Sequence, residues 1–246
     1  MIICYLGPEA LALLADAIKF MAVLNEVNVA FNQIGSEGGI ALRDALKTSN
    51  LKFITIGKMY TSAGGAVVTG SQLTTGVTLY AGGRLGELIK GPDSAFDVKL
   101  KWTDDGKESS YMKLHSLDGE PLKLPLQSPF EGELLDLAHQ QLDPGYVLLL
   151  SWWLGTEFSA AVNSLTIDST GNMNICKTYT LTAGKEKVDL SKKNLGSADV
   201  ALVAAWLQRP EVSAVIARLT LSGNKITGTK YAGIGNYDYD PDVSGL

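Results

Sequence analysis

The sequence contains few of the residues that carry most enzyme and metal chemistry. Among 246 residues there are only two histidines and two cysteines. His115 and His139 lie in different segments, and neither belongs to a metal-ligand spacing pattern. Cys4 and Cys176 are too few for a disulfide framework. We therefore expect no metal site and two free thiols in a reducing intracellular compartment, the cytoplasm by preference.

Basic clusters and long apolar runs are also missing. The net charge of −5 disfavours binding to the phosphates of nucleic acid. The apolar stretch 10–24 is interrupted by Asp16 and Lys19, and the run 146–154 is too short to span a bilayer. Neither insertion into a membrane nor a signal peptide is expected, although import into an organelle through a removed segment stays open.

Motifs for nucleotide binding and for nucleophilic catalysis are absent as well. The glycine-rich stretch 35–39 falls where a turn into a helix is expected, so a phosphate site is not predicted there. Asp238, Asp240 and Asp242 alternate as in a calcium loop, but the glycine and glutamate that such a loop needs are missing. The sequence therefore predicts no enzyme, no cofactor and no small-molecule ligand. The acidic tail is expected to be either a solvated segment or part of a further repeat.

A strand–turn–helix pattern is present at residues 24–47. Leu24, Val27 and Val29 mark a short strand, and the Asn32 side chain is expected to turn inward and satisfy backbone groups where the strand ends. A helix with one apolar face follows over 34–47. The strand pattern returns 27 residues later, which is typical of a repeat.

A second pair of segments is duplicated at an offset of 53 residues. Residues 134–154 match 187–207, and the paired Trp153 and Trp206 are predicted to lie in the core between repeats. The other matched pairs are Asp136 and Asp189, Leu137 and Leu190, Leu142 and Leu195, Val147 and Val200, Leu149 and Leu202, and Leu154 and Leu207.

These segments resemble the leucine-rich repeat family, in particular its ribonuclease-inhibitor-like repeats. The resemblance covers roughly 1–60 and 133–228. Asn32, Asn194 and Asn224 stand at the asparagine position of that family, where Gln141 departs from it. The resemblance implies an α/β leucine-rich-repeat solenoid of strand–helix repeats, and a stacked surface for binding proteins.

The segment 76–117 has no helical period and is rich in turn residues. Its opening and its 98–111 hairpin resemble SH3-like barrels of the Tudor and KOW kind, and we expect this small all-β barrel to interrupt the solenoid. The predicted strands are 77–80, 85–90, 97–102, 108–112 and 114–117. The predicted domains are repeats at 1–73, the barrel at 74–119, a proline-containing linker at 120–132, and repeats with the acidic tail at 133–246.

Four aromatic residues are candidates for binding a partner. Tyr80, Trp102 and Tyr111 could form a cage for a methylated lysine or a peptide groove, or they could fill the barrel core. Trp152 turns about 100° away from Trp153 on a helix, which makes it a candidate interface anchor.

The predicted function is a non-catalytic protein-interaction or scaffold protein, a subunit of a multi-subunit complex. Two alternatives stay open: a regulator that inhibits an enzyme by covering its active site, and a reader of modified peptides through the barrel.

Overall fold

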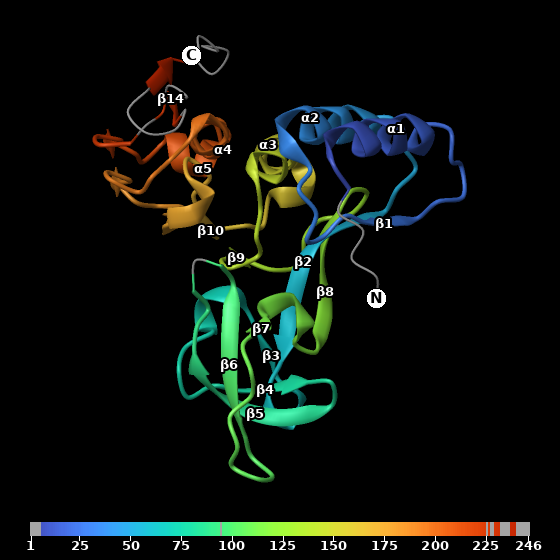
Figure 1. Cartoon of the computed structure of the whole chain (residues 1–246). Helices are drawn as coiled ribbons and strands as arrows, with labels where there is room; N and C mark the ends of the chain where they lie inside the picture. The colour runs from blue at the N-terminus through green and yellow to red at the C-terminus, as the bar shows by residue number, and fades with distance from the viewer. Residues whose placement is uncertain (1–5, 94, 225, 227–228, 232–236, 240–246) are drawn as a thin grey trace.

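The computed structural model of the chain describes residues 6–93, 95–224, 226, 229–231 and 237–239. The helices in these ranges are α1 (Pro8–Ile18), α2 (Gly35–Leu46), α3 (Pro144–Leu154), α4 (Ser197–Leu207) and α5 (Pro210–Ser213). Helices α1 to α4 lie along one side of the molecule, with small sheets beneath them (Figure 1). Within the described ranges, none of the helices is both long enough and apolar enough to cross a bilayer.

The described strands fall into five separate sheets. The first contains β1 (Glu26–Asn28), β2 (Phe53–Thr61), β3 (Val67–Val68) and β8 (Gly119–Pro125). The second contains β9 (Leu134–Leu137), β10 (Ser164–Asp168) and β11 (Thr178–Thr182). Two-stranded sheets are formed by β12 (Lys187–Asp189) with β13 (Arg218–Thr220) and by β14 (Thr229–Tyr231) with β15 (Tyr237–Tyr239). The fifth contains β4 (Thr78–Ala81), β5 (Arg84–Lys90), β6 (Asp97–Trp102) and β7 (Met112–Lys113).

The predicted leucine-rich-repeat solenoid is wrong as the fold class. Such a solenoid needs one continuous parallel sheet, but parallel pairing is limited to β1–β2, β9–β10 and β12–β13 among the described strands. Strand β8 pairs antiparallel with β2, and β11 pairs antiparallel with β10. These antiparallel neighbours occupy the edges that a further parallel strand would need. The fold is instead mixed α/β, with several small sheets and one half-barrel.

The predicted small all-β barrel is observed only as a half-barrel, formed by β4 to β7 (Figure 1, lower part). The three strands predicted at 77–80, 85–90 and 97–102 are observed as β4, β5 and β6, within one residue at each end. The fourth shrinks to the two residues of β7, and the fifth is a 3₁₀ turn at Leu114–Ser116. The half-barrel has its own apolar core, to which Tyr60 of β2 contributes.

Helices α1, α2, α3 and α4 pack side by side in chain order over the main core. Glycine permits the close approach of α2 to α3, since a Cβ added to Gly39 would lie 2.3 Å from the carbonyl oxygen of Gly145. The bounds of α4 lie 53 residues after those of α3, which is the offset of the duplicated sequence. Trp153 and Trp206 are fully buried at equivalent positions in these two helices.

The segment predicted as a linker, 120–132, begins inside strand β8. Its attachment to the main core is direct, because the indole Nε1 of Trp153 donates a 2.8 Å hydrogen bond to the carbonyl oxygen of Pro125. The predicted domain boundaries stay a prediction. Cys4 and the tail residues Asp240 and Asp242 lie outside the described residues.

Candidate functional site

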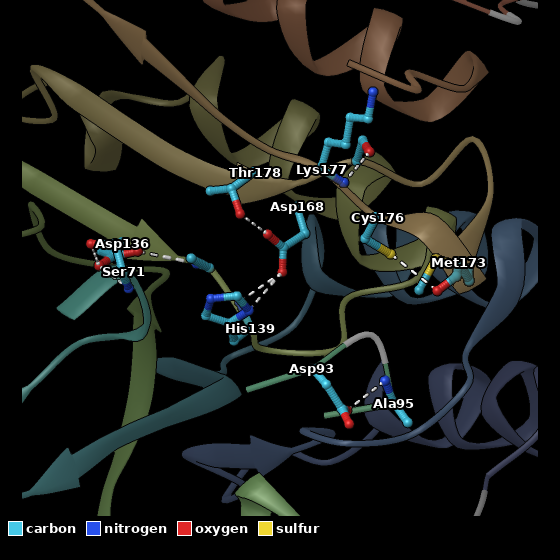
Figure 2. Close-up of polar contacts among 12 residues, drawn as sticks. Ser71, Asp93, Ala95, Asp136, His139, Asp168, Met173, Cys176, Lys177 and Thr178 are labelled. Carbon is cyan, nitrogen blue, oxygen red and sulfur yellow. Dashed lines mark hydrogen bonds and ion pairs between the residues drawn. The ribbon is translucent and has the colours of Figure 1, made fainter. Parts of the chain in front are cut away.

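A small cavity of about 160 Å³ lies where the half-barrel meets the second sheet. One wall is the loop between β5 and β6, and the other is formed where β9 and β10 end (Figure 2). Its lining residues are Pro92, Asp93, Phe96, His139, Asp168, Cys176 and Thr178. The cavity brings together His139 and Cys176, which the sequence separates by many residues.

The strand order explains why these side chains meet. Strands β9 and β10 are parallel, with Leu137 opposite Ile167, so their carboxyl ends lie at the same edge of the sheet. His139 follows the end of β9, and Asp168 is the last residue of β10. The antiparallel strand β11 then begins with Thr178 opposite Asp168.

The Asp168 carboxylate is already engaged in structural hydrogen bonds. Its Oδ2 accepts from the backbone N–H of His139 at 2.7 Å, and its Oδ1 accepts from the Thr178 hydroxyl at 2.6 Å (Figure 2). The His139 ring Nδ1 lies 3.8 Å from Asp168 Oδ2. His139 adopts a left-handed backbone with φ 59°, and the Asp168 bond stabilises this turn. The carboxylate therefore holds the strand ends together.

Cys176 is not poised for nucleophilic chemistry. Its thiol donates to the carbonyl oxygen of Met173 at 3.2 Å (Figure 2). Burial, with a smaller effect of the charges on Asp168 and Asp199, raises the pKa of the Cys176 thiol to about 11. A thiol with this pKa is protonated at neutral pH, whereas nucleophilic and metal-binding cysteines are thiolates.

The opposite wall of the cavity is also engaged within its own loop. The Asp93 carboxylate accepts from the backbone N–H groups of Ala95 and Asp97, each at 2.9 Å. These bonds, that from Asp97 first, lower the pKa of Asp93. Among the described residues, no group of three or more His, Cys, Asp and Glu side chains could hold a metal ion. The polar groups of the cavity therefore serve the local structure.

The aromatic residues predicted to form a cage are not brought together. Leu79, Gly86 and Trp102 form one row across the half-barrel sheet, and Tyr80 lies in the next row, so its side chain points to the other face. Trp102 instead stacks with the Arg84 guanidinium at 4.4 Å. Tyr111 lies beside two lysines, with Lys90 Nζ 5.1 Å and Lys99 Nζ 5.9 Å from the ring centroid.

Trp152, the predicted interface anchor, is half-buried and packs against the main core. Trp206 is buried, with the Arg209 guanidinium 4.7 Å from its ring centroid.

The three predicted structural asparagines divide into two kinds. The Asn32 side chain accepts from the Leu6 N–H at 2.9 Å and donates to the Val29 carbonyl oxygen at 2.9 Å. Asn224 repeats this arrangement: its side chain accepts from the Leu195 N–H and donates to the carbonyl oxygen of Leu221, three residues earlier. It also donates to the carbonyl oxygen of Leu190, directly after β12. Asn194 differs, because it takes a left-handed backbone and donates to loop carbonyls at 172 and 175.

Sequence reasoning missed Gln140, which joins three parts of the fold. Its amide accepts from the Lys58 N–H at 2.7 Å and donates to the Lys58 carbonyl oxygen at 2.8 Å. The Lys58 ammonium in turn donates to the carbonyl oxygens of His115 and Leu117. No periodic pattern marks Gln140, because its partner lies 82 residues away in the chain.

Two buried carboxylates were missed as well. Asp143 caps α3 through the Gly145 N–H at 2.9 Å and also accepts from the Gly35 N–H at 2.7 Å. Asp199 accepts hydrogen bonds from the N–H and hydroxyl of Thr170, from the Gly196 N–H and from the Tyr179 hydroxyl. Burial raises the pKa of both the Asp143 and the Asp199 carboxyl groups. The sequence did carry a signal for Asp143, because an aspartate followed directly by a proline is typical of the start of a helix.

An exposed apolar surface lies on helix α1 and the turn after it. Leu13 is 74% exposed, Phe20 86% and Val23 87%, and Met21 is also exposed. We call these four residues the α1 surface. Their large exposed fractions contrast with the buried Leu11 and Ile18 on the side of α1 that faces the core.

The comparisons with known proteins return no relative. No protein family, no curated protein and no solved structure matches the chain. The family resemblances read from the sequence therefore have no relative to test them.

Proposed function

We propose that this chain is a non-catalytic binding component of a larger protein assembly, and that its α1 surface contacts a partner. The observation that carries the proposal is the exposure of Leu13, Phe20 and Val23 on one continuous segment. Exposure of a cluster of large apolar side chains to water is unfavourable. Binding of a partner would remove this apolar surface from water.

The size of the α1 surface supports this function. Its exposed side chains amount to an area on the order of 500 Å², comparable to the largest apolar patches on monomers, which are often functional. Burial of that area is worth on the order of 10 kcal/mol before the cost of association is subtracted. A partner that covers only this surface would bind with moderate affinity.

The chemistry of the cavity favours binding over catalysis. The Asp168 carboxylate is engaged by His139 and Thr178, and the Cys176 thiol is protonated at neutral pH. A general base or a nucleophile needs an available group of matched pKa. The function proposed is therefore protein recognition without turnover.

The proposal extends to partner class and compartment. A net charge of −5 favours protein partners over nucleic acid. A free, protonated Cys176 thiol fits a reducing intracellular compartment, and the cytoplasm is the compartment proposed.

The test compares two variants that each place a charge at an exposed apolar position. Immobilised wild-type protein, Phe20→Glu and Leu134→Glu are exposed to an extract of the native cells, and retained proteins are identified by mass spectrometry. Leu134 is 72% exposed on β9, so Leu134→Glu is the matched control. We expect retention by the wild type and by Leu134→Glu but not by Phe20→Glu. Equal retention by all three, or turnover of a substrate, contradicts the proposal.

A further inference from the structure

We infer that a second copy of this chain covers the α1 surface, through antiparallel pairing of two α1 helices about a twofold axis. This inference rests on the proposed function, because it names the partner of the same surface. Closed twofold dimers are the commonest assemblies of soluble proteins, and they require a surface that is complementary to itself. The α1 surface meets that requirement in its shape and in its charges.

The exposed side of α1 is a narrow apolar stripe. At 100° per residue, Leu13, Ala17 and Phe20 fall within about 60° of one another around the helix. All three are exposed, whereas Leu11 and Ile18 on the opposite side are buried. The backbone N–H of Phe20 bonds to the Ala17 carbonyl oxygen at 3.1 Å, so Phe20 continues the stripe beyond the last residue of α1.

The stripe is complementary to itself when a second helix runs in the opposite direction. Ala17, a small residue, lies between the two large ones and permits close approach of the helices. With the twofold axis beside Ala17, Phe20 of each copy packs between Ala17 and Leu13 of the other. Both large side chains then lose their exposed surface to the same contact.

The charges beside the stripe fit the same arrangement. Asp16 and Lys19 lie on one flank of the helix and form an exposed ion pair of 2.8 Å within the chain. A twofold axis perpendicular to two antiparallel helices keeps that flank on the same side of the pair. Asp16 of one copy then faces Lys19 of the other, so four charges alternate in sign.

The area that the two copies can bury limits the expected affinity of the dimer. Even burial of the whole α1 surface in both copies, Met21 and Val23 included, would remove only on the order of 1,000 Å² from water, the lower limit for a specific interface. We therefore expect a reversible dimer that is populated at micromolar concentration or above.

The experiment is sedimentation equilibrium of the full chain from about 1 to about 200 µM. We expect the mass to rise from 26.2 kDa toward twice that value. Phe20→Glu should weaken the dimer by at least about tenfold, and Leu134→Glu should leave it unchanged. Asp16→Lys and Lys19→Asp should each weaken it, and the double variant Asp16→Lys/Lys19→Asp should restore it. Circular dichroism melts establish that each variant is folded.

Three results would overturn the inference: a monomer at every concentration, a dimer that Phe20→Glu leaves unchanged, or a double charge reversal that does not restore pairing. A monomeric wild type whose retention of other proteins still depends on Phe20 refutes the dimer and leaves the proposed function standing. A monomer that retains nothing refutes both.

Discussion

Replacement of Asp143 should expose how strongly α3 is tied to α2. The carboxylate is buried, and it accepts from Gly145 in its own helix and from Gly35 at the start of α2. Asp143→Ala removes both acceptors at once. Asp143→Ser keeps a side chain that can cap α3 but cannot reach the Gly35 N–H, so the two substitutions separate the two roles.

The magnitudes follow from these contacts. Loss of the cap costs about 1 kcal/mol. The partly buried Gly35 N–H left without an acceptor costs a further ~1–3 kcal/mol. We expect Asp143→Ala to lower the free energy of unfolding by about 2–4 kcal/mol and Asp143→Ser by about 1–3 kcal/mol. Both are large fractions of the roughly 5–15 kcal/mol that stabilises a typical domain.

The assay is urea denaturation followed by circular dichroism, with the exposed Glu131→Ala as control. The control should change the free energy of unfolding by no more than about 0.5 kcal/mol. A cost below about 1 kcal/mol for Asp143→Ala would refute the assignment of Asp143 as the tie between α2 and α3. Equal costs for the Ser and Ala variants would refute the separate role of the cap.

The same residue makes a prediction about pH. Burial raises the pKa of Asp143 above its value in the unfolded chain. Its contribution to stability from this shift is therefore fully present below the unfolded pKa of about 3.9 and is lost as the pH rises through the folded pKa. Asp143→Asn does not titrate, so the difference in stability between it and the wild type should change across that range.

Three further predictions concern packing and reactivity. Gly39→Ala should destabilise the fold by several kcal/mol, because its Cβ would overlap a carbonyl of α3. Gly7→Ala meets no neighbouring atom and changes only the N-cap of α1, so thermal melts should show a much smaller loss. Trp153→Phe should lower the melting temperature, because a buried carbonyl of β8 loses its donor; an unchanged melt would refute this. Cys176, in a Cys4→Ser background, should react with iodoacetamide about tenfold faster for each pH unit up to about pH 11, as measured by mass spectrometry; a plateau near pH 8.5 would contradict the raised pKa.

The sequence predicted the local elements better than their pairing. The apolar face of residues 34–47 became α2, and the strands at 85–90 and 97–102 became β5 and β6. The duplicated 53-residue unit placed α3 and α4 in equivalent positions with a buried tryptophan in each. These features depend on periodicity and propensity, which act over a few residues and are readable from the chain.

The overall arrangement could not be read in this way. Pairing of Phe53 with Pro125 joins strands about seventy residues apart, and it closes one edge of β2 to further parallel strands. Whether such a pairing forms depends on the entropy of closing the loop and on the apolar surface buried in return, and neither leaves a local pattern. The solenoid prediction was wrong because the sequence carries no sign of this long-range antiparallel pairing.

The candidate site likewise has features that the sequence determines and features that depend on the tertiary structure. The sequence by itself determined which residues are scarce and where the helix α2 and the strands β5 and β6 form. Only the tertiary structure decided that His139, Asp168 and Cys176 share one cavity, and that Tyr80 and Trp102 lie on opposite faces of a sheet. The reason is physical: periodicity acts within one segment, whereas register and edge pairing arise only when distant segments compete for the same backbone hydrogen bonds.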